Sequence, residues 1–267
     1  MQRGRTVLTP PSEPSSLDRP EPATTRDAIH GLGLTLIQPR AGHRVGADAV
    51  LLAAAAGPPV DKLVDVGAGV GAVGLSLLKR WPHARGDLVE IAPDLAELAR
   101  ENAREAGVEA RVVCVDLFDR KARRAAELRE GEADLVVTNP PFYAAGSVRA
   151  SPDSDRARAH VLATDLGDWI VASLALLRPG GRFVMICRPE DLRAALEAVG
   201  QRLGGVAVRP VHPKAEAAAI RILLSGVKGS RAPLALLPGL TLHEADGNFT
   251  PLAAAIHRGE ARFDGPR

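Results

Sequence analysis

Residues 62–80 read KLVDVGAGVGAVGLSLLKR, an apolar segment that runs into a cluster of glycines and then into a helix-forming sequence. Residues 62–66 have the short apolar run of a buried strand, and residues 72–80 predict a helix. Glycines between the two allow a tight turn, because a residue without a Cβ adopts backbone conformations that others avoid. A strand that leads through glycines into a helix is typical of the first unit of an open α/β sheet.

Strand and helix patterns alternate along the rest of the chain. Apolar strand patterns recur at residues 86–91, 110–119, 133–141, 178–187, 205–211 and 217–227. Helical patterns fall at residues 48–56, 72–80, 92–107, 165–177, 190–204 and 250–259, with Asp48 and Thr250 as expected N-caps. This alternation predicts a mostly parallel sheet with helices on both faces. The last two strands have only a short connection, so we expect them to pair antiparallel.

The first residues differ in composition from the rest. Residues 1–27 are rich in Pro, Ser, Thr and charge, which predicts a disordered N-terminal tail. Residues 28–267 then form a single domain, a size that fits one α/β unit. An apolar fraction of 46% is that of an ordinary globular protein.

Cysteine positions and hydropathy bear on the cellular compartment and on metal and membrane binding. Cys114 and Cys187 lie far apart in apolar runs, so we expect two buried free thiols in a reducing cytoplasmic setting. No Cys or His spacing typical of a metal site occurs, so no metal is expected. No apolar run is long enough for a membrane span, so no membrane partner is expected.

Acidic residues follow the glycine-rich strand and the next two strands. Asp65 precedes the Gly67-x-Gly69-x-Gly71 cluster, Glu90 ends the second strand and Asp116 ends the third. At the carboxyl edge of a parallel sheet, these groups suit S-adenosylmethionine (SAM). Glu90 would accept hydrogen bonds from the ribose hydroxyls and Asp116 from the adenine amino group, while Asp65 orients the loop or faces the methionine amino group. The predicted cofactor-binding set is Asp65, Gly67, Ala68, Gly69, Gly71, Glu90, Ile91, Asp116, Leu117 and Asn139.

The fourth strand ends in TNPPFY, residues 138–143, which contains the only tyrosine of the chain. An exocyclic amino group conjugated to a ring or carbonyl is a poor nucleophile, and acceptors for both of its N–H groups would favour methyl transfer. The Asn139 side-chain oxygen and the Pro140 carbonyl supply two acceptors, which the rigid prolines hold in place. Phe142 and Tyr143 would stack on a planar acceptor. The predicted catalytic set is Asn139, Pro140, Pro141, Phe142 and Tyr143.

The order of these motifs resembles class I SAM-dependent amino-methyltransferases. Across most of the chain, GHRVGADAVLLAAA, LVDVGAGVG, TNPPFY and RARAH resemble the bacterial adenine-N6-methyltransferases that modify adenine 37 of a valine tRNA. The resemblance implies a Rossmann-like, seven-stranded class I methyltransferase sheet, mostly parallel with the last strand antiparallel. It also implies SAM as cofactor, RNA as partner and a role for residues 44–48 in closing over the cofactor.

Basic residues suggest where RNA would bind, although the net charge is only +2. Candidates are Arg149, Arg156 and Arg158 in the loop after TNPPFY, together with Arg44 and Lys214. Segment 206–231 is also basic, with Arg209, Lys214, Arg221, Lys228 and Arg231 against Glu216. Such residues would neutralise phosphates. We expect a monomer or weak homodimer.

Other functions share parts of this pattern. A protein glutamine N5-methyltransferase uses the same Asn-Pro-Pro chemistry, but usually has a helical domain before the methyltransferase domain, for which the roughly 60 residues before the first strand leave little room. An rRNA guanine-N2-methyltransferase has a similar loop. A DNA adenine methyltransferase would need a long insertion for target recognition, and we see none in this sequence. Gly69–Gly74 alone would fit a NAD-dependent oxidoreductase.

Overall fold

A computed structural model of the chain describes residues 24–41, 44–141 and 165–263. Most of the predicted tail, Phe142, Tyr143, Arg149, Arg156 and Arg158 lie outside the described residues. The strands are β1 (Thr24–Ile29), β2 (Leu34–Pro39), β3 (Lys62–Val66), β4 (Arg85–Glu90), β5 (Arg111–Cys114), β6 (Ala133–Thr138), β7 (Leu177–Cys187), β8 (Leu203–Lys214), β9 (Arg221–Lys228), β10 (Ala235–Leu236) and β11 (Leu240–His243). The helices are α1 (Ala47–Ala55), α2 (Ala72–Arg80), α3 (Pro93–Ala106), α4 (Arg120–Ala125), α6 (Leu166–Leu176), α7 (Leu192–Val199) and α8 (Pro251–His257).

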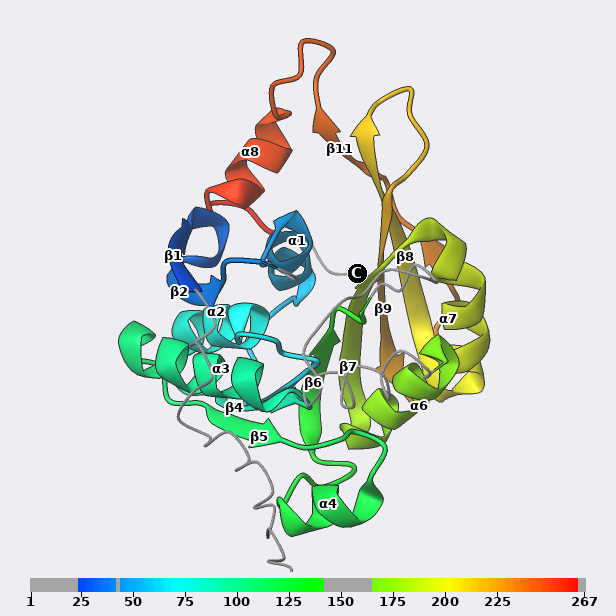
Figure 1. The fold of residues 1–267 in the computed structure, drawn as a ribbon. Helices are drawn as coiled ribbons and strands as arrows, with labels where there is room; N and C mark the ends of the chain where they lie inside the picture. The colour runs from blue at the N-terminus through cyan, green and yellow to red at the C-terminus, as the bar shows by residue number, and fades with distance from the viewer. Residues whose placement is uncertain (1–23, 42–43, 142–164, 264–267) are drawn as a thin grey trace, which may run out of the picture.

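The central sheet has the strand order β8-β9-β7-β6-β3-β4-β5 (Figure 1). Neighbouring strands from β7 to β5 are parallel, and β9 pairs antiparallel with both β7 and β8. This arrangement confirms the predicted mostly parallel sheet with an antiparallel last strand, although the sheet has nine strands within the described residues and not seven. Two short strands that the sequence did not reveal, β10 and β11, add to the outer side of β8.

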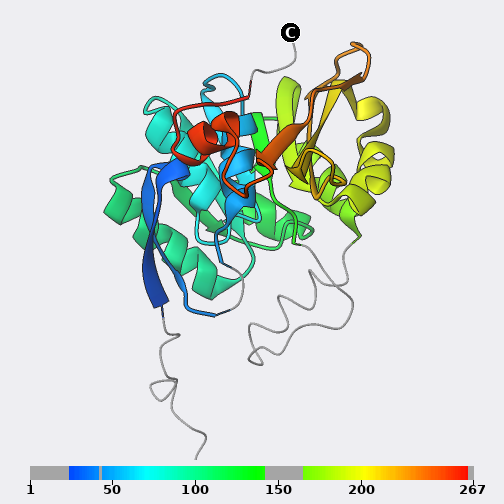
Figure 2. The same cartoon turned by 90° about the horizontal axis from the view of Figure 1, so that it is seen from above.

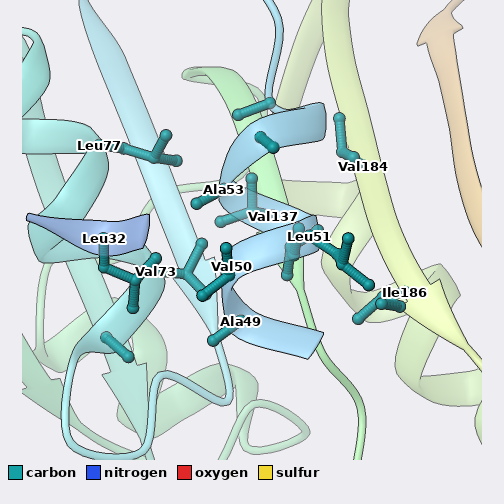
Figure 3. Close-up of a cluster of buried hydrophobic side chains, with 14 of the residues drawn as sticks. Leu32, Ala49, Val50, Leu51, Ala53, Val73, Leu77, Val137, Val184 and Ile186 are labelled. Carbon is teal, nitrogen blue, oxygen red and sulfur yellow. The ribbon is translucent and has the colours of Figure 1, made fainter. Parts of the chain in front are cut away.

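Helices cover both faces of the sheet. One apolar cluster joins α1, α2 and α8 to Leu63, Leu135 and Val184, and Figure 3 shows α1 at its centre. A second cluster joins α6 and α7 to Val64, Val136 and other residues of the opposite face. Because both faces are covered, the central strands are apolar at nearly every position.

An antiparallel hairpin precedes the sheet. Strand β1 pairs with β2 from Thr24↔Pro39 to Ile29↔Leu34, so residues 24–27 belong to the hairpin and not to the predicted tail. In Figure 2 the blue hairpin runs beside the teal α3. Its charged residues are paired, since Arg26 bonds Glu105 of α3 and Asp27 bonds Arg44. Residues 24–27 are therefore an ordered part of β1, although their polar composition resembles that of the tail.

Two local predictions were wrong. Asp48 does not cap α1, because Gly46 is the N-cap and the Asp48 carboxylate bonds Arg221 of β9. Cys114 is exposed, since β5 is the last strand of the sheet, whereas Cys187 in β7 is buried as predicted. Thr250 does cap α8 through its hydroxyl. Within the described part of the chain, no helix combines the length and apolarity that a membrane span requires.

Asn102 of α3 ties the hairpin to the glycine-rich loop. Its side chain is fully buried, donates to the carbonyls of Ile37 and Val70, and accepts from the Ile37 amide. Two of these bonds satisfy the backbone groups of Ile37 in β2, and the third satisfies the carbonyl of Val70 in the glycine-rich loop. Asn102 therefore fixes the position of the loop that follows β3.

We predict that Asn102→Ala lowers the free energy of unfolding by roughly 2–5 kcal/mol, because it leaves three buried backbone groups without partners. Urea denaturation followed by circular dichroism would measure the change. Glu101→Ala, one position away on the same helix, is the matched control and should cost less than about 1 kcal/mol. Equal losses in the two variants would contradict the anchoring role of Asn102.

Candidate active site

The ends of β3 and β6 meet at the carboxyl edge of the sheet. Val66 pairs with Thr138, so Gly67 and Asn139 leave the sheet side by side. The Thr138 hydroxyl donates to the Val66 carbonyl over 2.8 Å and accepts from the indole nitrogen of Trp169 over 3.0 Å. The glycine loop and the Asn-Pro-Pro loop thus share one buried anchor.

The glycine loop needs its glycines for conformation and for space. Gly67, Gly69 and Gly71 have φ values of 72°, 56° and 88°, in the left-handed region that other residues rarely adopt. A Cβ on Gly67 would lie 3.0 Å from the Trp169 ring. A Cβ on Gly69 would meet nothing within 4 Å, so open space lies beside the loop there.

Glu90 holds this loop in place. Its carboxylate accepts from the Gly69 amide over 2.8 Å and from the Ile91 and Ala92 amides over 2.9 Å. Burial raises the pKa of Glu90 in spite of these amide bonds, which favour the charged form. The carboxylate therefore has a structural task besides the predicted contact with ribose.

Asp65 lies beneath the loop and is 3% exposed. Its Oδ2 atom accepts from the Gly74 amide of α2 over 2.8 Å. Burial raises the pKa of Asp65 to about 7, and the charge of Glu90 adds to the shift. An acid with this pKa gains or loses its proton readily near neutrality, and a cation beside it would favour its charged form.

The remaining predicted cofactor residues follow β5 and surround the loop. Asp116 is half-exposed and accepts from the Phe118 amide over 2.8 Å, which turns the chain after β5. Leu117 and Ala68 are buried, and Ile91 is half-buried after β4. The acids of β3, β4 and β5 thus lie in strand order along one edge, as predicted.

A cavity of about 390 Å³ opens beside the glycine loop. Its lining includes Asp65, residues 67–70, Asn139 and all five residues of segment 44–48. Glu90 and Asp116 do not line it in the described part of the chain, so they lie farther along the sheet edge. The structure therefore brings together the glycine loop, segment 44–48 and the Asn-Pro-Pro loop.

Asn139 lines this cavity and carries an unsatisfied polar atom. Its Oδ1 atom is buried and has no hydrogen-bond partner within the described residues. Pro140 is buried beside it and Pro141 is half-buried. A buried acceptor without a donor costs roughly 1–3 kcal/mol, so the site gains stability when a donor enters.

Sequence patterns predicted neither the role of Trp169 nor the place of Arg221 in the cavity. Trp169 of α6 packs against Gly67 and bonds Thr138, but it lies 30 residues after Asn139 and belongs to no local motif. Arg221 lines the cavity from β9 and bonds Asp48 over 2.8 Å. Only the tertiary fold brings these side chains to the site.

The basic residues proposed for RNA that the structure describes are mostly engaged within the fold. Arg44 lines the cavity but bonds Asp27 over 2.9 Å, and Lys214 donates to the Ala245 carbonyl. Lys228 donates to two carbonyls at the end of α6, and Arg209 lies over the Phe263 ring. Segment 206–231 is thus not one free basic surface.

Comparison with known proteins identifies the family. Residues 45–198 match the methyltransferase small domain. The chain belongs to this methyltransferase family. The match spans the cavity-lining segment 45–48, the glycine loop, the Asn-Pro-Pro loop and α6, which are the elements that build the site.

Individual relatives carry more specific names. A Porphyromonas gingivalis tRNA1(Val) (adenine(37)-N6)-methyltransferase is 34% identical over 223 residues, which cover 78% of this methyltransferase and 84% of the relative. A release factor glutamine methyltransferase from Cereibacter sphaeroides is 31% identical, over 60% of this chain and 59% of that one. The crystal structure of an Agrobacterium tumefaciens protein described as a predicted O-methyltransferase has a TM-score of 0.67 and 29% identity, over 81% of this chain and 98% of that one.

The raised pKa of Asp65 predicts a pH-dependent stability. Between the ordinary value of 3.8 and about 7, the folded protein keeps a proton that the unfolded chain has lost. The unfolded state then binds fewer protons, so stability falls as pH rises through this window, by about 1.4 kcal/mol per unit of pKa shift.

We expect Asp65→Asn, which cannot ionise but can still accept from Gly74, to lack this fall. Urea midpoints of the two proteins across the same pH window would therefore diverge, with the wild type losing stability relative to the variant. The exposed Asp61→Asn serves as control and should follow the wild type. Parallel curves for wild type and Asp65→Asn would show that the buried carboxyl does not hold its proton.

Proposed function

We propose that this methyltransferase transfers a methyl group from SAM to the N6 amino group of an adenine in RNA, most specifically adenine 37 of a tRNA anticodon loop. The Porphyromonas gingivalis relative supports the substrate, because it carries that name and aligns over most of both chains. The observation that carries the proposal is the buried, unpartnered Oδ1 atom of Asn139, a residue that lines the same cavity as the glycine loop.

Asn139 acts on the acceptor amino group. The lone pair of an adenine amino group is delocalised into the ring, so the nitrogen must lose planarity as it forms a bond to carbon. Asn139 Oδ1 accepts one N–H and the Pro140 carbonyl accepts the other, which directs the lone pair at the methyl group. Because both acceptors are fixed before the reaction, they need no reorganisation in the transition state.

The chain fixes these acceptors through neighbouring residues. Thr138 is bonded to Val66 and Trp169, and Pro140 and Pro141 limit backbone rotation after it. Phe142 and Tyr143, which lie outside the described residues, are proposed to stack on the base. Such stacking contributes roughly 1–3 kcal/mol per base.

The residues along the sheet edge fit the cofactor. SAM supplies a methyl group on a positively charged sulfur, which leaves as a neutral thioether when the N–C bond forms. We assign Asp65 to the methionine ammonium group, residues 67–71 to the close approach of the backbone, Glu90 to the ribose and Asp116 to the adenine. The proton of the methylated nitrogen passes to solvent after transfer, so no strong base is required.

A protein glutamine methyltransferase is the second candidate. The Cereibacter sphaeroides relative carries that name, and a glutamine amide nitrogen presents the same two N–H donors to Asn139. That alignment covers smaller shares of both chains than the alignment with the Porphyromonas gingivalis relative. The two candidates differ in the acceptor and not in the chemistry at Asn139.

Labelled SAM incubated with separate pools of tRNA, rRNA and protein would distinguish the candidates. We expect label in tRNA, released as N6-methyladenosine on digestion to nucleosides. Label in N2-methylguanosine from rRNA would contradict the proposed acceptor base. Label in N5-methylglutamine of a release factor would establish the second candidate instead.

We predict that Asn139→Ala abolishes methyl transfer, by roughly 100-fold or more, while the SAM dissociation constant changes only a few fold. Single-turnover assays and calorimetric titration with SAM would measure the two effects. Glu90→Ala provides the opposite pattern, because it should weaken SAM binding first. An equal loss of binding and turnover in Asn139→Ala would mean that Asn139 is structural.

A further inference from the structure

The cavity has a second side, opposite the glycine loop. Its lining there consists of Val211, Ile220, Arg221 and Leu242, from the outer strands β8, β9 and β11 and the turn before β9. In Figure 1 these strands extend past the rest of the sheet and lie across from α1 and α8. The proposed cofactor lies over β3, β4 and β5, so the acceptor must approach Asn139 from this other side.

We propose that Arg221 binds a phosphate of the acceptor nucleotide and that Asp48 positions its guanidinium group. This inference rests on the proposed function, because it assumes that the acceptor is a nucleotide in RNA. It assigns the acceptor end of the cavity to Arg221 and Asp48, whose contact with each other the sequence did not predict.

The topology places Arg221 at the reacting edge of the sheet. Strand β9 runs antiparallel to β7, and its residue Ile222 pairs with Cys187 at the carboxyl end of β7. The first residue of β9 therefore lies at the edge where Asn139 follows β6. Two strand spacings separate β9 from β6, about 10 Å, which a single nucleotide can span.

Two contacts orient the guanidinium group. Its Nε atom donates to Asp48 Oδ2 over 2.8 Å, and its Nη1 atom donates to the Ile220 carbonyl over 2.7 Å. The two side chains remain 29% and 23% exposed, so the pair stands at the cavity wall and not in the core. A planar guanidinium held in this way is pre-organised for an oxyanion, since little freedom is lost on binding.

The neighbouring wall suits a nucleoside. Val211 is buried in β8 and Leu242 in β11, while Ile220 remains exposed before β9. Aliphatic side chains cover the faces of a flat base, whereas a phosphate needs a cation beside them. A glutamine side chain has neither a broad apolar face nor a negative charge, so an apolar wall with an arginine favours the nucleotide.

Arg221 is a better candidate than the other cation of the cavity. Arg44 bonds Asp27 and Thr25 and lies within reach of the Pro39 and Arg40 carbonyls, so its guanidinium is directed toward the β1–β2 hairpin. Its contacts hold segment 44–48 in place. Arg221 is instead held by a residue of that segment, which couples the acceptor wall to the start of α1.

The test compares wild type, Arg221→Gln and the control Arg193→Gln on an RNA stem-loop with an unpaired adenine. Arg193 is 89% exposed on α7, where it pairs with Glu197. Arg193→Gln therefore removes one positive charge, as Arg221→Gln does, but at a position that does not line the cavity. We expect Arg221→Gln to raise the KM for RNA roughly tenfold and to lower the salt slope of binding by about 0.7–1, the contribution of one phosphate contact. SAM affinity should stay within a few fold.

Conservative variants separate positioning from charge. Asp48→Asn keeps the arginine, so it should raise the KM for RNA several fold while the salt slope stays near that of wild type. Arg221→Lys keeps the charge and the contact with Asp48, so it should retain most of the slope but only part of the affinity. If Arg221→Gln does not fold, the paired results for Arg221→Lys and Asp48→Asn decide the question.

Different results would overturn the role of Arg221 and the proposed function. RNA methylation by wild type with an unchanged KM and salt slope in Arg221→Gln would overturn this inference and leave the proposed function intact. A rise in the SAM dissociation constant as large as the rise in the RNA KM would assign Arg221 to the donor and also overturn it. No label in any RNA from the wild type would remove the proposed function and this inference together.

Discussion

The hydrogen bond from the Thr138 hydroxyl to the Val66 carbonyl is the contact on which the site depends. It joins the ends of two neighbouring parallel strands, one leading into the glycine loop and the other into Asn-Pro-Pro. Trp169 completes the anchor, because its indole bonds Thr138 while its ring packs against Gly67. The separation of the glycine loop from the Asn-Pro-Pro loop is thus set by buried contacts.

The buried acids serve structure and chemistry together. Asp65 and Glu90 each accept backbone amides that shape the loop, and burial raises the pKa of both. Two carboxyls close together in a water-poor site are costly unless a cation joins them. The ammonium group of a methyl donor, which we propose beside Asp65, would lower that cost.

Local sequence patterns predicted the seven strands from β8 to β5 of the central sheet, most helices and the glycine loop, because periodicity and turn residues act over short distances. Contacts between distant segments were not predictable. Asp48 was expected to cap a helix but bonds Arg221, 173 positions away, and Trp169 reaches Gly67 only through the packing of α6. No strand was predicted over residues 235–243, yet β10 and β11 form there and pair with the extended β8.

The central claim is that Asn139 Oδ1 accepts a hydrogen bond from the amino group that is methylated. A crystal structure with S-adenosylhomocysteine and an RNA stem-loop would test it most directly. The expected result is an adenine amino nitrogen about 2.7–3.2 Å from Asn139 Oδ1, on the side facing the sulfur. An Asn139 side chain turned away from the sulfur, with no space for a base beside it, would contradict the account.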